Sequence, residues 1–117
     1  MRSIQEGNII SNEDRELLGE VKAIVQRFIP AADLLLYGSG ARGARTPEPE
    51  SDYDLLVLTD YPVGIEEQNK IRDAMYDYEL SQGILICLVF YDRNEWNSPP
   101  DSGSPFHYNV EREAVVL

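Results

Sequence analysis

Two aspartates lie one residue apart at the start of an apolar segment, and this feature constrains the fold of the chain most. In LYGSGARGARTPEPESDYDLLVL, residues 36–58, Asp52 and Asp54 lead into a run of leucine and valine. Side chains alternate faces along a strand, so both carboxylates share one face, with Cα atoms roughly 6.5–7 Å apart. Such like charges repel unless a positive group lies beside them. Mg²⁺ is a natural partner, because it prefers oxygen ligands and takes one or two carboxylates plus substrate phosphates.

A glycine-rich turn precedes the aspartates and supplies a candidate anion site. Gly38, Ser39 and Gly40 follow one predicted strand and precede a predicted short helix at residues 40–44. Free backbone N–H groups at a helix N-terminus favour phosphate, and glycines let the backbone approach it closely. Arg42 is placed to pair with phosphate or with an aspartate. The turn lacks the G-x-x-x-x-G-K-[ST] pattern of the usual P-loop.

Hydrophobic periodicity predicts one domain, residues 1–117, of the α/β or α+β class, with a small mixed sheet of about three to four strands and helices packed on it. Helices are predicted from a Ser11 cap to Phe28, over 64–80 and from Ser104 to Glu113, with strands over 33–37, 53–58 and 84–91. The third strand is a continuous apolar run, which predicts a central position. Residues 91–104 are predicted to be a polar loop held by Trp96, and AVVL an apolar tail.

Composition narrows the function classes. The net charge of −11 argues against binding nucleic-acid backbone, which needs Lys and Arg, and is compatible with metal ions or a basic partner protein. Cys87 is the single cysteine, so no disulfide framework is expected. No apolar stretch approaches the roughly 18 residues of a membrane span, and the N-terminal segment lacks a signal-peptide pattern. A cytoplasmic location without membrane contact is therefore expected.

GSGARG followed by SDYDLLV resembles the signature of minimal nucleotidyltransferases, within the DNA polymerase β-like superfamily. The helix before the first strand and the segments GILICLVFYDRNEW and SPFHYNVEREAVVL also resemble these proteins, so the resemblance covers nearly the whole chain. It implies that Gly38 and Ser39 hold a nucleoside triphosphate, expected to be ATP, with Arg42 in support. It further implies that Asp52 and Asp54 bind Mg²⁺ and that a nucleoside monophosphate passes to an acceptor hydroxyl.

The resemblance also implies a partner. Minimal nucleotidyltransferases often pair with a small helical HEPN-domain protein as a toxin–antitoxin system, in which the nucleotidyltransferase is the antitoxin and in some cases adenylylates the partner. A chain of 117 residues has no room for a substrate domain, so a protein is expected to be the acceptor or to present it. The sequence leaves open whether the working unit is a monomer or a homo-oligomer.

The third predicted strand departs from the family pattern. Active members commonly carry a third carboxylate there, whereas this run has no acid and Cys87 falls near that position. Cys87 is interpreted as a small core residue, and Asp92 as facing the other side of the strand. The alternative function is therefore an impaired nucleotidyltransferase fold that neutralises a partner by contact alone. His107 and Trp96 are interpreted as structural, and nucleic-acid polymerisation is disfavoured by the acidic charge.

Overall fold

The computed structural model describes residues 2–3, 11–37 and 52–117, with side chains described in the last two ranges. The predicted helix at 40–44 lies outside these residues. The elements in chain order are β1 (Arg2–Ser3), α1 (Asn12–Phe28), β2 (Asp33–Tyr37), β3 (Tyr53–Thr59), α2 (Ile65–Gln82), β4 (Ile86–Asp92), α3 (Arg93–Trp96), the 3₁₀ helix η2 (Asp101–Gly103), α4 (Pro105–Glu113) and β5 (Val115–Val116).

The helix boundaries follow from local chemistry that the sequence had signalled. Ser11 caps α1, with its Oγ accepting a hydrogen bond from the Asp14 N–H at 3.1 Å. Ser104 caps α4 in the same way, accepting from the His107 N–H at 3.0 Å, and Pro105 is the first helical residue. Helix α2 runs two residues beyond its predicted end to reach Gly83, whose φ of 67° is the left-handed cap conformation.

The strands form a five-stranded mixed sheet in the order β1-β5-β2-β3-β4. β2 is antiparallel to β3 and β5, whereas β3–β4 and β1–β5 are parallel pairs. The C-terminal segment that was predicted to be only an apolar tail supplies β5, which pairs with β1 and β2. The fold class is confirmed as a mixed sheet with packed helices, with β1 and β5 as strands that the sequence did not indicate.

The prediction that the third strand is central is wrong, because β4 lies at the edge of the sheet. Within β4, Leu88 is buried, Cys87 is exposed and the other residues are intermediate, so the apolar run did not report the order of the strands. Side chains of α2 engage backbone groups of the outer edge. Arg72 Nη2 donates to the Leu88 carbonyl at 3.3 Å, and the Ile86 N–H donates to Glu79 Oε2 at 2.8 Å. Such engagement discourages another strand from pairing there.

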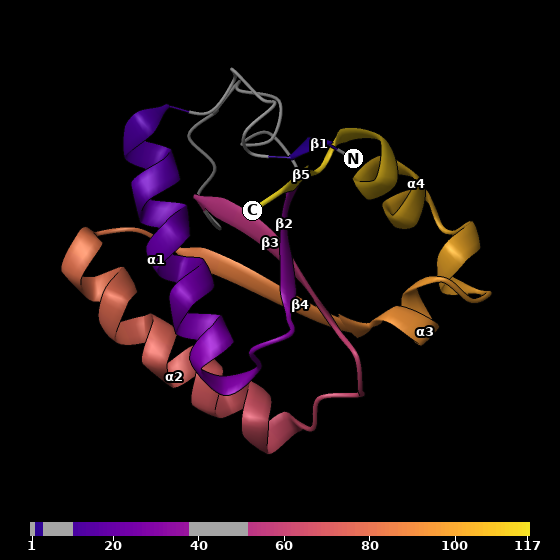
Figure 1. Cartoon of the computed structure of the whole chain (residues 1–117), viewed down its shortest axis with the longest axis horizontal. Helices are drawn as coiled ribbons and strands as arrows, with labels where there is room; N and C mark the ends of the chain where they lie inside the picture. Colours follow the sequence, from indigo (N-terminus) through magenta and orange to yellow (C-terminus); the bar gives the residue numbers. More distant parts are fainter. Residues whose placement is uncertain (1, 4–10, 38–51) are drawn as a thin grey trace.

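Helices cover both faces of the sheet (Figure 1). On one face, α1 and α2 pack over alternate residues of the central strands, such as Leu36 and Leu55. On the other face, α3 and α4 pack over Leu35 and Leu56, with Trp96 in the centre of that core. Among the described residues, no helix is both long enough and apolar enough to cross a membrane.

The segment predicted to be a polar loop around Trp96 contains α3 and η2. Trp96 is 2% exposed and makes edge contacts with the rings of Tyr91 and Phe106. Its Nε1 donates to Glu111 Oε1 of α4 at 3.0 Å. The prediction that Trp96 holds this segment is therefore confirmed, whereas the prediction of a loop without regular structure is wrong, because an Asp92 cap starts α3.

Candidate active site

Asp54 is the second residue of β3, whereas Asp52 lies just outside the strand. Asp52 immediately precedes the strand and is exposed. Its N–H donates to the Leu85 carbonyl at 2.8 Å, and its Oδ2 accepts from the Leu85 N–H at 2.9 Å. This reciprocal pair joins the beginning of β3 to the segment that leads into β4. Asp52 is thus placed by backbone geometry, while part of its carboxylate still faces solvent.

Asp54 is half-buried in the middle of a three-residue row. It pairs with Tyr37 on β2 and with Cys87 on β4, so the three side chains lie side by side on one face. The next residues along the same face, Leu56 and Val89, contact the core around Trp96. Tyr37 at one end of the row packs against this core, whereas Cys87 at the other end is exposed.

Cys87 is exposed, so its interpretation as a small core residue is wrong. Alternation along β4 puts it on the face of α3 and α4, but at the uncovered end of the strand. Partial burial and the charge of Asp54 raise the pKa of the thiol, and Arg72 opposes this rise. At neutral pH Cys87 is consequently a neutral thiol beside Asp54. A thiol is a poor ligand for a hard metal ion.

Tyr37 is the other neighbour of Asp54. Its ring makes an edge contact with Phe106 of α4, with centroids 5.2 Å apart. Burial raises the pKa of the phenol strongly, and nearby Cys87, Asp54 and Tyr91 add to the rise. The phenol therefore keeps its proton beside the carboxylate. The sequence analysis did not single out Tyr37, although its position directly before Gly38 was a usable signal.

Two carboxylates are the metal-binding groups that the described part of the site offers. Asp92 lies at the far end of β4, where its Oδ1 accepts from the Glu95 N–H at 2.9 Å and caps α3. Among residues 11–37 and 52–117, no three His, Cys, Asp or Glu side chains converge on one point. Asp52 and Asp54 offer hard carboxylate oxygens two residues apart in the chain, and Mg²⁺ prefers such donors together with phosphate oxygens.

The predicted phosphate-binding residues Gly38, Ser39 and Arg42 lie outside the described residues. The residue before them is nevertheless placed. Tyr37 ends β2 and pairs with Asp54, so the chain enters Gly38 directly beside the second aspartate. β2 therefore ends at the same end of the sheet at which β3 begins.

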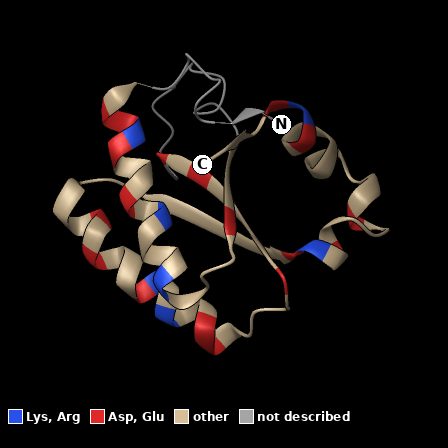
Figure 2. Cartoon of the chain, viewed as in Figure 1, with Lys and Arg blue, Asp and Glu red and all other residues tan. Residues whose placement is uncertain are grey.

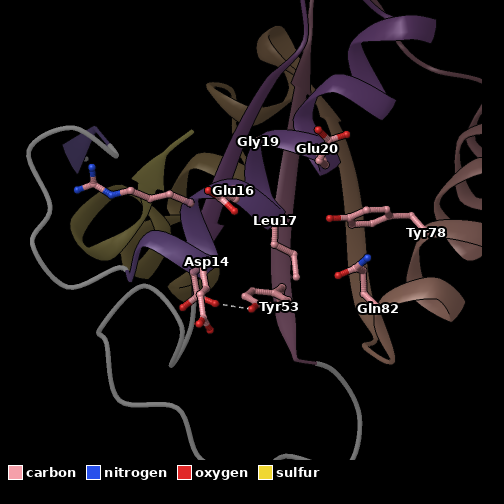
Figure 3. Close-up of a pocket in the computed structure, with 10 residues that line it drawn as sticks. Asp14, Glu16, Leu17, Gly19, Glu20, Tyr53, Tyr78 and Gln82 are labelled. Atoms are coloured by element: carbon pink, nitrogen blue, oxygen red, sulfur yellow. Dashed lines mark hydrogen bonds between the residues drawn. The ribbon is translucent and has the colours of Figure 1, made fainter.

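Tyr53, between the two aspartates, points to the opposite face and fixes β3 against α1. Its hydroxyl donates to Asp14 Oδ1 at 2.5 Å (Figure 3). It also lines a pocket of about 730 Å³ between α1 and α2 with the residues Glu13, Asp14, Arg15, Glu16, Leu17, Gly19, Glu20, Tyr78 and Gln82. This pocket is acidic and lies across the sheet from Asp54. Its carboxylates would repel nucleotide phosphates, and neither Asp52 nor Asp54 is among the residues that line it, so the row around Asp54 is the stronger candidate site.

His107 belongs to the packing of α4 rather than to the aspartate row. Its ring lies against Trp96, with centroids 4.4 Å apart, and its Nε2 is 3.8 Å from Glu111 Oε1. Its side chain is 15% exposed. These contacts agree with the predicted structural role.

The mixed sheet has helices on both faces, and Asp54 of β3 pairs with Tyr37, the residue before the glycine-rich motif. The chain matches the family model of the nucleotidyltransferase domain over residues 15–114, and it belongs to this family. The match includes the glycine turn and both aspartates. The chemistry of this family is nucleotidyl transfer. A comparison with curated proteins found no match.

Proposed function

We propose that the protein transfers a nucleoside monophosphate, AMP from ATP, to a hydroxyl of a partner protein, in the manner of the antitoxin of a HEPN pair. The observation that carries this proposal is that Asp54 pairs with Tyr37, the residue before Gly38, while Asp52 lies just before β3. Gly38 and Ser39, supported by Arg42, would hold the triphosphate at this end. Asp52 and Asp54 would hold Mg²⁺, which neutralises phosphate charge and orients the reacting groups when bound.

In the proposed step the acceptor oxygen bonds to the α-phosphorus of the nucleotide. The bond from that phosphorus to the oxygen bridging the β-phosphate breaks, and pyrophosphate leaves with the electron pair. The acceptor proton passes to a carboxylate or to water. In the described part of the site, Asp54 is the group suited to accept it, because the Cys87 thiol beside it is protonated. Tyr37 keeps its proton and contributes a donor to the row.

A protein acceptor fits the charge of the chain better than a nucleic acid does. Carboxylates lie along both α1 and α2 (Figure 2), and the net charge is −11. An acidic surface repels a phosphate backbone and attracts a basic protein.

The test is the intact mass of every chain that copurifies with the protein from its native host, after addition of ATP and Mg²⁺. We expect a nucleotidyl mass increment on a companion chain with wild type, and its loss with Asp54→Ala. Asp60→Asn is the matched control, because Asp60 is an exposed acid at the other end of β3, where it pairs with Arg93. An increment that survives Asp54→Ala would contradict the assigned site.

The second candidate is a binding module that neutralises its partner without chemistry, and the neutral thiol at Cys87 favours it. Asp54→Asn separates the two candidates. If the asparagine variant still binds and neutralises the partner as wild type does, the enzymatic account of neutralisation fails and the binding module is supported.

A further inference from the structure

The C-terminal half of α2 and the start of β4 expose three large apolar side chains together. Tyr76, Leu80 and Leu85 are 59%, 64% and 52% exposed. Together with Glu79, Gly83 and Ile84 they line a groove of about 280 Å³. Tyr76 and Leu80 are one helical turn apart, so they present one stripe. Exposed apolar side chains gathered in this way mark interaction surfaces more often than isolated ones do.

This groove reaches the candidate active site. Leu85 forms one wall of the groove, and its N–H and carbonyl are the two groups that bond Asp52. A protein seated on the groove would therefore bring its own side chains next to Asp52.

The charge around the groove selects the kind of partner. Glu79 lines the groove, and from Asp73 to Gln82 α2 contains two further acids, Asp73 and Asp77, and neither Lys nor Arg. The last turn of α2 has no basic residue to offset the negative end of the helix dipole. Lysine or arginine beside the apolar contact would complement this rim. A second copy of the same chain would bring a net charge of −11 against it, which opposes self-association.

The edge of β4 selects the partner's secondary structure. An extended peptide could add a strand to an open edge, but Glu79 and Arg72 already engage the Ile86 N–H and the Leu88 carbonyl. The groove with its stripe of Tyr76 and Leu80 instead suits an apolar helix face, as in helix-in-groove recognition.

We propose that Tyr76, Leu80 and Leu85 form a docking surface for an amphipathic helix of the acceptor protein, with Lys or Arg flanking its apolar face. The identity of the occupant as the acceptor rests on the proposed function, whereas the docking surface itself does not. Docking there would hold an acceptor hydroxyl near Asp52 and Asp54. Contacts remote from the reacting atoms would then position the hydroxyl for reaction.

The first experiment uses a synthetic amphipathic helix with leucine on one face and lysine on the other, added to the ¹⁵N-labelled protein and followed by NMR. We expect chemical-shift changes centred on residues 76–85 and extending to Asp52. The double variant Leu80→Gln/Leu85→Gln should weaken binding at least about tenfold. Ile65→Gln is the matched control and should bind as wild type does, because Ile65 is 64% exposed at the opposite end of α2.

Four results would overturn the docking surface. The first is that the leucine–lysine helix does not bind, and the second is that a leucine–glutamate helix binds equally well. The third is that the chemical-shift changes centre on the acidic pocket of residues 13–20. The fourth is that sedimentation equilibrium shows self-association of the wild-type protein through residues 76–85. The last would identify a second copy as the occupant.

The second experiment repeats the intact-mass assay on the copurified complex. Loss of labelling in Leu80→Gln/Leu85→Gln, with labelling retained in Ile65→Gln, supports docking of the acceptor. Equal labelling in all three proteins overturns it and leaves the transferase intact. Absence of labelling in wild type contradicts the proposed transfer, and the docking surface is then decided by the peptide experiment alone.

Discussion

Cys87 on β4 lies directly opposite Asp54 on β3 in the parallel register of the two strands. The family resemblance places a third carboxylate near this position, and here a neutral, exposed thiol stands beside the second aspartate. The site therefore has two carboxylates in its described part, and under the proposed function no third acid there would orient the acceptor hydroxyl.

Replacing Cys87 with aspartate should increase Mg²⁺-dependent transfer, because it adds a carboxylate beside Asp54 that can orient or deprotonate the acceptor. A positioned general base contributes on the order of 10²-fold or more. Rates of partner labelling in wild type and Cys87→Asp measure this effect. Cys87→Asn is the matched control for size and polarity, and an equal gain with asparagine would show that the charge is not responsible.

The same variant has a readout that does not depend on activity. A new carboxylate beside Asp54 increases like-charge repulsion in the absence of metal. Mg²⁺ should therefore raise the thermal midpoint of Cys87→Asp more than that of wild type or Cys87→Asn. If Mg²⁺ shifts all three midpoints equally, Cys87 and Asp54 do not share a metal position.

Tyr37→Phe should reduce the loss of stability at alkaline pH. The folded protein raises the pKa of this phenol above its ordinary value of 10.0, so above about pH 10 the unfolded chain releases a proton that the folded protein keeps. The contribution of this phenol to the free energy of unfolding is fully present below that pH and is lost as pH rises. The loss is at most about 1.4 kcal/mol per pH unit, and it is smaller here because the phenol is only partly buried. Urea unfolding between about pH 9 and pH 11 measures the slope. Tyr76→Phe, which removes an exposed phenol, is the control, and an identical slope in Tyr37→Phe and wild type would contradict the prediction.

Local signals in the sequence predicted local structure well. The caps at Ser11 and Ser104 and the strand over residues 53–58 depend on neighbours within a few residues, and the structure confirms them. The signals act through hydrogen bonds and strand alternation, which need no distant partner.

Features set by distant partners were not predictable in the same way. β4 lies at the edge of the sheet because the C-terminal strand β5 pairs with β2 and not with β4. The exposure of Cys87 depends on where α3 and α4 stop covering the sheet. An apolar run reports that a strand has buried faces, but it contains no information on which strand lies beside it or where a helix ends above it.

Tyr53→Phe should destabilise the fold by about 1 kcal/mol, because it removes the hydrogen bond to Asp14 that joins β3 to α1. Both residues also line the pocket between α1 and α2, so the bond is partly shielded from water. Urea unfolding at neutral pH measures the change. Tyr61→Phe is the control, since its 3.0 Å bond to Glu67 is fully on the surface and should contribute little. Equal effects of the two substitutions would show that the Tyr53 bond has no special structural role.

Alanine at two glycines should change stability in opposite directions. Gly83 has a φ of 67°, a conformation that a side chain disfavours by roughly 1 kcal/mol, so Gly83→Ala should destabilise by about that amount. Gly19 lies inside α1, and an added Cβ there would meet no atom within 4 Å. Gly19→Ala should therefore stabilise by roughly 0.5–1 kcal/mol through helix propensity. Differential scanning calorimetry of both variants against wild type gives the two signs directly. If Gly19→Ala destabilises the protein, then α1 at residue 19 contacts a part of the chain beyond the described residues. If Gly83→Ala leaves the stability unchanged, then α2 ends differently in solution.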